Sequence, residues 1–433
     1  MIARLLGNLG SRSEVEQYLK HYGQGDARKW AVIQVSGEAL EEALDDVASA
    51  LAFLAEVGLQ PIVVHGARPQ IKSALAGRGL ALDASRDGRP EVLDVVRRVS
   101  HRANNQLLEA LENLGVRARS ITAGVFRAEP GAQGRFGLSS RAVSVDLESV
   151  RWALTAGAVP VISALGETGE GQILSLDPAA AARSLAGNLR PHKLVFLDER
   201  GGLPGPTGRR MSAVNLAEDY ETLVADPAVE TSVKETLSAL YELLLELPSE
   251  SSVSFTAPHQ LAKELFTHTG AGTLVRLGVR VNAFERFDAL DTRRLRALLE
   301  ECFQKPLDPH YFRHREAHRV YLSADYRATA VVVDLGAGVP YLDKFAVTAA
   351  AQGEGLGASV WRRLTRDEPK LFWRARPDNP INPWYFRHSQ GSFHADGWVV
   401  FWYGLSDFQA AKALVDRASA LPPTFIESSP RSE

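Results

Sequence analysis

Apolar and polar positions along the first 280 residues follow two alternating patterns. Short apolar runs predict strands, and the longer amphipathic stretches between them, with apolar positions three or four residues apart, predict helices. Strands are expected at residues 30–35, 61–64, 193–197 and 251–255, and near 119, 143 and 159. Helices are expected over 11–22, from about 38 through 57, and over 91–114, 233–247 and 258–266. This alternation predicts an α/β domain with an open, mostly parallel sheet that helices cover on both faces.

The pattern changes after about residue 280, and we place a domain boundary there, giving domains 1–280 and 281–433. A helix over 291–303 and strands over 319–322 and 328–333 lead to an alternating run that begins at Tyr341. A glycine-rich loop follows, and the helical spacing after it ends at Pro369. The second domain is therefore predicted as a mixed sheet with helices.

The loop after this strand has the composition of an anion site. It comprises Gln352, Gly353, Glu354, Gly355, Leu356 and Gly357. Glycines let backbone N–H groups approach a phosphate, and the N-terminus of the next helix favours negative charge. Q-x-x-G-x-G after a strand resembles the acetyl-CoA pyrophosphate loop of the GNAT acetyltransferases. A dinucleotide site and a plain turn are the alternatives, but too few residues follow to complete a dinucleotide-binding half.

Composition limits the classes of function. The chain has 433 residues, 45% hydrophobic and 23% charged, as expected for a soluble globular protein of two or three domains. A net charge of −3 gives no electrostatic argument for nucleic acid or an acidic membrane surface. The sequence shows neither a run long enough to span a membrane nor a signal peptide, so we expect a cytoplasmic protein.

A single cysteine, Cys302, excludes an intrachain disulfide framework and a cysteine-based zinc site. Its apolar flanks favour packing over a role as a nucleophile. We expect no metal.

Two arginines close to the glycine loop suggest a carboxylate substrate. If LFWRAR is a strand, Arg374 and Arg376 lie on one face, where paired guanidinium groups can bind carboxylates. A solvated strand face with surface ion pairs is the alternative.

Four separated motifs over about 285–420 resemble the acetyltransferase domain of the N-acetylglutamate synthase family, both vertebrate-type synthases and bacterial bifunctional synthase/kinases. The motifs are PYLDKFAV, QGEGLG, LFWRARPDNPINPWYF and FWYGLSDF. The resemblance implies an enzyme that transfers acetyl from acetyl-CoA to L-glutamate, opening arginine biosynthesis. It also implies acetyl-CoA contacts from Phe345, Ala346, Val347, Gln352, Gly353, Gly355, Leu356 and Gly357. Lys344, Arg374, Arg376 and Asn379 match positions that hold glutamate, and Tyr385 matches the catalytic tyrosine.

The expected reaction is consistent with these residue types. An amine attacks a thioester carbonyl, a positioned donor stabilises the oxyanion, and the leaving thiolate benefits from a proton. Tyr385 is the expected acid, with an ordinary core aromatic as the alternative. The base for the amine stays open among Asp343, His388, His394 and a water relay.

The first domain resembles the amino-acid kinase fold of acetylglutamate kinases. The matching motifs are AVIQVSGEAL, PIVVHGARPQI, ITAGVFRAE, VPVISALGET and KLVFLDERGGL. Kinases of this type carry Lys where this chain has Gln34, Gly where it has Ser36, and Gly where it has Arg68. We therefore expect a kinase-inactive domain kept for assembly and regulation, with a bifunctional synthase/kinase as the alternative.

A helix end and glycine turn in the first domain resemble the L-arginine site of arginine-sensitive members. The residues are Tyr18, Lys263, Glu264, Gly270, Gly272 and Thr273. An ordinary helix end and turn is the alternative. The family also implies a homo-oligomer, a dimer or tetramer. Two further classes are an arginine-binding regulatory protein with an inactive acetyltransferase, which the intact loop and Tyr385 oppose, and a protein-lysine acetyltransferase, which would favour an acidic groove over two arginines.

Overall fold

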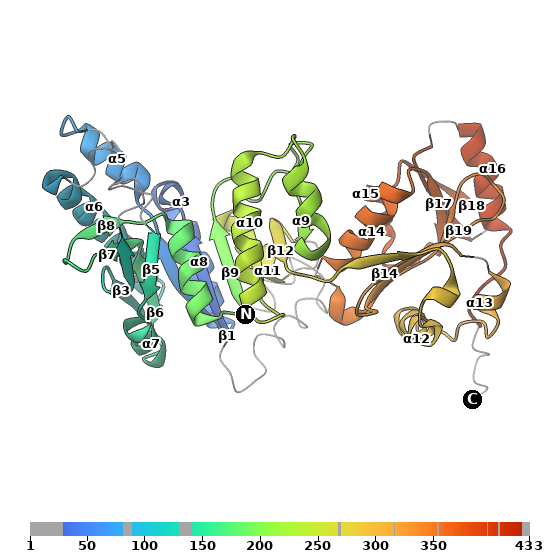
Figure 1. The fold of residues 1–433 in the computed structure, drawn as a ribbon, viewed down its shortest axis with the longest axis horizontal. Helices are drawn as coiled ribbons and strands as arrows, with labels where there is room; N and C mark the ends of the chain where they lie inside the picture. The colour runs from blue at the N-terminus through green and yellow to red at the C-terminus, as the bar shows by residue number, and fades with distance from the viewer. Residues whose placement is uncertain are drawn as a thin grey trace. The chain divides into compact units, whose positions relative to one another are not determined.

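The computed structural model describes residues 29–80, 89–129, 141–266, 270–315, 317–352, 355–395, 397–405 and 408–426 (Figure 1). The helix expected over 11–22, with Tyr18, and Gly353 of the glycine loop lie outside these ranges. The chain divides into two compact units, Met1–Leu216 with Tyr220–Leu277, and Ala217–Asp219 with Gly278–Glu433.

An eight-stranded sheet in the order β10-β12-β11-β9-β1-β2-β6-β3 forms the centre of the first unit. Its neighbouring strands are parallel except β11 and β12, which are antiparallel. Its strands are β1 (Lys29–Val35), β2 (Leu59–His65), β3 (Ala118–Ile121), β6 (Val159–Ser163), β9 (Lys193–Leu197), β10 (Ala213–Asn215), β11 (Ser252–Thr256) and β12 (Thr273–Arg276). A smaller four-stranded sheet has the order β5-β4-β7-β8, with β4 (Phe126–Glu129), β5 (Arg141–Val145), β7 (Leu165–Glu167) and β8 (Ile173–Ser175).

Both faces of the large sheet are buried. Along β1, Val32 packs into one apolar cluster, whereas Ala31 and Ile33 pack into another, because successive side chains point to opposite faces. The covering helices are α3 (Gly37–Glu42), α4 (Leu44–Glu56), α5 (Arg68–Ala76), α6 (Pro90–Asn113), α7 (Glu148–Thr155), α8 (Pro178–Leu189), α9 (Leu216–Ala225), α10 (Thr231–Glu246), η1 (Pro258–Gln260) and α11 (Leu261–Phe266). The predicted parallel-rich sheet with helices on both faces is confirmed.

One local prediction in this unit was wrong. The helix expected through residue 57 is two helices, because Ala43 leaves helical geometry with φ −137° and ψ 34°. The sequence pattern did not predict most of the smaller sheet, because its strands span three to five residues and are too short for a clear periodicity.

The second unit is built on a seven-stranded mixed sheet in the order β13-β14-β15-β16-β17-β19-β18. Only β16 and β17 pair in parallel; the other neighbours are antiparallel. The strands are β13 (Val281–Phe284), β14 (Ala317–Ser323), β15 (Ala328–Val333), β16 (Tyr341–Val347), β17 (Leu371–Ala375), β18 (Gly391–Ala395) and β19 (Trp398–Tyr403). The predicted mixed sheet is confirmed.

Helices cover both faces of this sheet as well. Along β15, Ala330 and Val332 face one cluster that includes α14 and α15 residues, and Val331 faces another that includes α12, α13 and α16 residues. We call these the α14 face and the α12 face. The helices are η2 (Phe287–Ala289), α12 (Thr292–Phe303), α13 (Tyr311–His314), η3 (Ala349–Ala351), α14 (Leu356–Asp367), α15 (Asn382–His388) and α16 (Phe408–Ser419).

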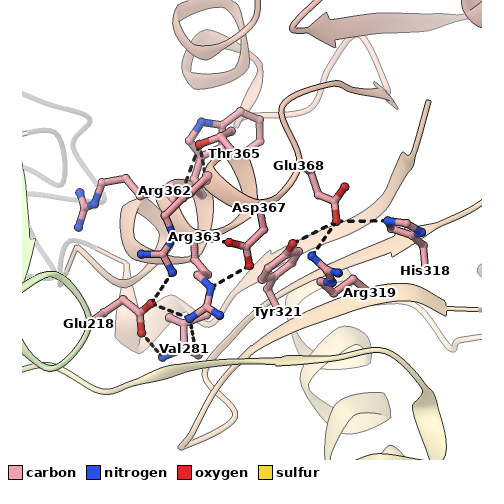
Figure 2. A network of polar contacts seen from close by, with 12 residues as sticks. Glu218, Val281, His318, Arg319, Tyr321, Arg362, Arg363, Thr365, Asp367 and Glu368 are labelled. Carbon is pink, nitrogen blue, oxygen red and sulfur yellow. Dashed lines mark hydrogen bonds and ion pairs between the residues drawn. The ribbon is translucent and has the colours of Figure 1, made fainter. Parts of the chain in front are cut away.

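A buried carboxylate at the end of α14 fixes this helix to β14. One oxygen of Glu368 lies 3.2 Å from His318 Nε2, 3.4 Å from Arg319 Nη1 and 3.2 Å from the Tyr321 hydroxyl (Figure 2). Burial raises the pKa of Tyr321, so its hydroxyl remains a donor to this carboxylate. The cluster anchors the helix that follows the glycine loop.

Candidate active site

The central feature of the second unit is a split between its two parallel strands. β16 and β17 pair only at Tyr341 and Phe372, so the facing edges separate beyond that point. A bulge on the other edge of β16 leaves Asp343 without a partner residue, because Val331 pairs with Lys344 and Val332 with Leu342. The main chain of Phe345, Ala346 and Val347 therefore lies beyond the split, where its β17-facing groups have no ladder partners.

The glycine loop leads directly from this strand into α14. Gly355 has φ 78° and ψ 0° at the N-cap, a left-handed conformation that suits glycine, and no side chain caps the helix. A Cβ on Gly357 would lie 3.1 Å from Val347 Cγ2, so the helix packs tightly on the strand end. The first N–H groups of α14, including that of Leu356, have no intrahelical partner. The Gln352 side chain donates to the Val347 carbonyl at 3.4 Å. This geometry suits an anion such as a pyrophosphate.

Tyr385 lies on α15 within the aromatic cluster of the α14 face. It is 5% exposed, and its ring packs near Phe345, Trp373, Trp384 and Phe401. Its hydroxyl makes no hydrogen bond with any residue that the structure describes. Burial raises the pKa of Tyr385, so the phenol stays protonated at neutral pH and can donate a hydrogen bond to a ligand.

Lys344 is buried on the α12 face and bound on several sides. Its Nζ lies 2.7 Å from Asp343 Oδ2, 2.7 Å from Thr424 Oγ1 and 3.2 Å from the Asp343 carbonyl. The Tyr311 hydroxyl donates to the same Asp343 oxygen at 2.5 Å. Burial lowers the pKa of Lys344, opposed by the Asp343 charge. Burial alone raises the pKa of Asp343, but Lys344 and Tyr311 together bring it below its usual value.

The two arginines share one face, as the spacing predicted. The guanidinium groups of Arg374 and Arg376 lie 3.9 and 4.1 Å from the centre of the Trp398 ring. Arg374 also donates to the carbonyls of Ala418 and Pro422 at 2.6 and 3.2 Å, so it supports the segment after α16. Arg376 follows β17 directly and is exposed. The sequence did not predict that Trp398 contacts these arginines, because its only signal was an aromatic residue at the start of a strand.

The asparagines of the NPIN segment shape the loop after β17. Asn379 Oδ1 accepts the N–H of Ile381 at 3.2 Å. Asn382 donates to the carbonyls of Arg376 and Pro377 at 2.8 and 3.1 Å. Its Oδ1 is buried without a partner among the described residues. These bonds hold the backbone around Arg376, and the sequence did not predict this role for Asn382.

The three open candidates for a base lie in different surroundings. Asp343 forms the ion pair with Lys344. His388 Nδ1 lies 2.8 Å from the Trp384 carbonyl, its ring stacks on Trp384 at 3.9 Å, and burial lowers its pKa. His394 is exposed on the edge strand β18. None of these positions identifies the base.

Glu264 in the first unit holds the glycine turn that precedes β12. Its Oε2 accepts the N–H groups of Ala271 and Gly272, both at 2.7 Å, and the residue is 9% exposed. A Cβ on Gly270 would lie 2.7 Å from this oxygen. Thr273 is fully buried and donates to the Met211 carbonyl at 2.5 Å. The structure brings these predicted residues together, whereas Lys263 is exposed on α11.

Two family descriptions match this chain. Residues 280–420 match "NAT, N-acetyltransferase, of N-acetylglutamate synthase", and residues 29–244 match the "Amino acid kinase family". An acetylglutamate kinase from Xylella fastidiosa is 43% identical over 97% of this chain and 100% of its own length. The human mitochondrial N-acetylglutamate synthase is 33% identical over 95% of this chain and 79% of its own. The chain belongs to the N-acetylglutamate synthase/kinase family.

Members of this family join an amino-acid kinase domain to an N-acetyltransferase domain, and the chain is an amino-acid N-acetyltransferase. A solved structure supports the fold: N-acetylglutamate synthase from Neisseria gonorrhoeae complexed with coenzyme A and L-arginine has a TM-score of 0.57 and 18% identity. The match covers 91% of this chain and 98% of that one. The predicted family and enzyme class are confirmed.

Among the described residues, no helix is long and apolar enough to cross a membrane. Within the same ranges, no group of three or more His, Cys, Asp or Glu could hold a metal ion. Burial and the charge of Glu301 raise the pKa of Cys302 to about 11, so its thiol is protonated at neutral pH.

Proposed function

We propose that this chain transfers acetyl from acetyl-CoA to the amino group of L-glutamate, opening arginine biosynthesis. The observation that carries the proposal is the split between β16 and β17, with the glycine loop and Tyr385 on the α14 face and Lys344 on the α12 face. A thioester that enters from the loop side can thereby meet an amine held near the cations on the other side.

Acetyl-CoA is the donor in this proposal. Its pyrophosphate binds the N–H groups of the glycine loop and the start of α14, formed by Gln352, Gly353, Gly355, Leu356 and Gly357. Its pantetheine arm pairs with the main chain of Phe345, Ala346 and Val347, which the split leaves without β17 partners. The same backbone groups can donate to the thioester oxyanion.

The acceptor is a dicarboxylic amino acid. We propose Lys344, Arg374, Arg376 and Asn379 as the binding residues, with the exposed Arg376 lying beside Trp398. Guanidinium groups bind carboxylates through paired hydrogen bonds. A lysine side chain in this position would place a positive charge among cations, so we expect a preference for glutamate.

Tyr385 is the proposed acid. The amine attacks the thioester carbon, the C–S bond breaks from the tetrahedral intermediate, and the leaving thiolate accepts a hydrogen bond and finally a proton from the phenol. The raised pKa keeps the proton on Tyr385 until negative charge develops on sulfur. A base or a water relay removes the amine proton.

Thiol release from acetyl-CoA tests this function. The rate should require L-glutamate, with glutamine and lysine poor substitutes. Faster acetylation of lysine peptides than of glutamate would show that the acceptor assignment is wrong.

We propose that L-arginine binds near Glu264 and changes this rate. Support comes from the carboxylate beside a glycine turn, where a guanidinium or α-ammonium can pair with Glu264. Regulation then requires two states with different affinities for arginine. The chain is proposed to act as a dimer or tetramer, which sedimentation equilibrium can measure.

Phosphorylation of N-acetylglutamate is the second candidate function, favoured by the name of the Xylella relative. We propose that it is lost. Gln34 is neutral where phosphoryl transfer needs positive charge. A Cβ on Gly37 would lie 2.6 Å from Pro69 Cδ, and Gln70 donates to the Gly37 carbonyl at 2.7 Å, so the loop with Ser36 is closed against the start of α5.

Several carboxylates lie near the carboxyl end of β1, among them Glu42, Asp198 and Glu199. The Ser36 N–H donates to the Leu197 carbonyl, which brings the start of α3 beside Asp198. A hydrogen bond with Glu42, the charge of Glu42 and further carboxylates raise the pKa of Glu199. Carboxylates that repel one another here also repel phosphates. Arg68 could restore positive charge from its own loop, so the assay for acyl phosphate decides the question.

A further inference from the structure

The segment after α16 lies over the proposed acceptor residues. We call residues 420–426 the C-terminal strap; the match to the N-acetyltransferase family ends at 420, so nearly all of the strap lies beyond it. The strap forms a short antiparallel pairing in which Asp308 N–H donates to the Thr424 carbonyl at 3.1 Å and Ile426 N–H donates to the Pro306 carbonyl at 2.9 Å. The Phe425 ring packs 4.7 Å from Phe303. The strap is therefore docked on the unit by its backbone and by an aromatic contact.

Two of the four residues proposed to bind the acetyl acceptor, Lys344 and Arg374, contact this strap. Thr424 Oγ1 lies 2.7 Å from Lys344 Nζ, and the Phe425 ring centre lies 5.2 Å from the same nitrogen. Arg374 donates to the Pro422 carbonyl and, just before the strap, to the Ala418 carbonyl. One short segment thereby restrains both cations.

The contacts of Lys344 show what this restraint achieves. An ammonium has three donors. Two are directed by the short contacts of 2.7 Å to Asp343 Oδ2 and Thr424 Oγ1, and the third has only the 3.2 Å contact with the Asp343 carbonyl. With only 4% of the side chain exposed, the ammonium cannot turn freely to find a ligand. This third contact is the longest of the three, so it is the one that an incoming carboxylate would replace.

We propose that the C-terminal strap is part of the acceptor site, and that Thr424 is a positioning residue that aims the Lys344 ammonium at an acceptor carboxylate. The inference rests on the proposed function. To that function it adds a residue outside the matched family domain, Thr424, and an orientation for the Lys344 ammonium. Among the described residues, the bonds of the strap to segments other than α16 run to Lys344, Arg374 and the 306–308 segment, so we expect its effect on the acceptor.

Thr424→Val is the test, since it keeps the side-chain shape and removes the oxygen. Steady-state kinetics should show the KM for glutamate raised about tenfold, because hydrogen bonds to charged groups are among the stronger ones. The KM for acetyl-CoA and kcat at saturating glutamate should stay within about twofold, as for lost uniform binding of one substrate. Thr424→Ser, which restores the hydroxyl, should return the KM to the wild-type value.

Other outcomes overturn the proposal. A lower KM for glutamate in Thr424→Val would show that the strap masks the cations, and an unchanged KM would show that the hydroxyl has no part in binding. A matched rise in both KM values, or failure of Thr424→Ser to restore binding, would reduce the strap to a support of the fold. If the wild-type chain acetylates a different amine, the proposed function fails separately, and the same variants are measured with that amine.

Discussion

Removal of the Tyr385 hydroxyl distinguishes a role as general acid from a role in aromatic packing. In Tyr385→Phe the ring keeps its contacts with Trp373 and Phe401, whose centroids lie 5.4 Å from it. The hydroxyl has no hydrogen-bond partner among the described residues, so its removal leaves no buried polar group unpaired. It should therefore alter the free energy of unfolding by less than about 1 kcal/mol. Loss of a general acid should lower kcat by about 10²-fold, or about 2.7 kcal/mol at 1.36 kcal/mol per factor of ten.

Thiol release with both substrates saturating measures this loss, and thermal unfolding measures stability in the same preparation. Tyr385→Ala is the contrasting variant, since loss of a large buried ring costs about 3–5 kcal/mol and should lower the melting temperature. The raised pKa of Tyr385 also predicts that the acid keeps its proton through mildly alkaline pH, so protonation of this phenol should not limit kcat between about pH 7 and 9. A Tyr385→Phe enzyme with wild-type kcat would show that Tyr385 is a core aromatic and not the acid.

Three further predictions test the other residues. Arg376→Ala should raise the KM for glutamate at least tenfold, because it removes a cation proposed to bind the acceptor; an equal rise in the KM for acetyl-CoA would contradict an acceptor role. Glu264→Gln keeps an oxygen for the Ala271 and Gly272 N–H groups but removes the charge, so it should abolish the response to millimolar arginine at an unchanged basal rate; a full response would place the effector elsewhere. Incubation with ATP and N-acetylglutamate should yield no acyl phosphate trapped as the hydroxamate; stoichiometric hydroxamate would show that Gln34 is compensated.

The sequence predicted the elements around the site closely because their patterns are local. The alternation from Tyr341 to Val347 coincides with β16, the glycines lead into α14, and the spacing of Arg374 and Arg376 placed them on one face. Each of these signals lies within a few neighbouring residues.

Features that depend on distant contacts could not be read in the same way. The bulge at Asp343 depends on its pairing with β15, and the surroundings of Lys344 depend on Thr424, 80 residues away. Glu264 likewise has the residue type of a ligand, yet its carboxylate already accepts two N–H groups of the following turn. In both cases the residue type was informative, but its existing partners were visible only in the folded chain.

A competition among acceptors shows directly which amine the enzyme acetylates. The purified chain is given acetyl-CoA and an equimolar mixture of glutamate, glutamine, aspartate and a lysine-containing peptide, and the acetylated products are identified by mass spectrometry. N-acetylglutamate should be the dominant product, formed in proportion to the thiol released. Acetyl groups found mainly on the peptide, or thiol released without N-acetylglutamate, would contradict it.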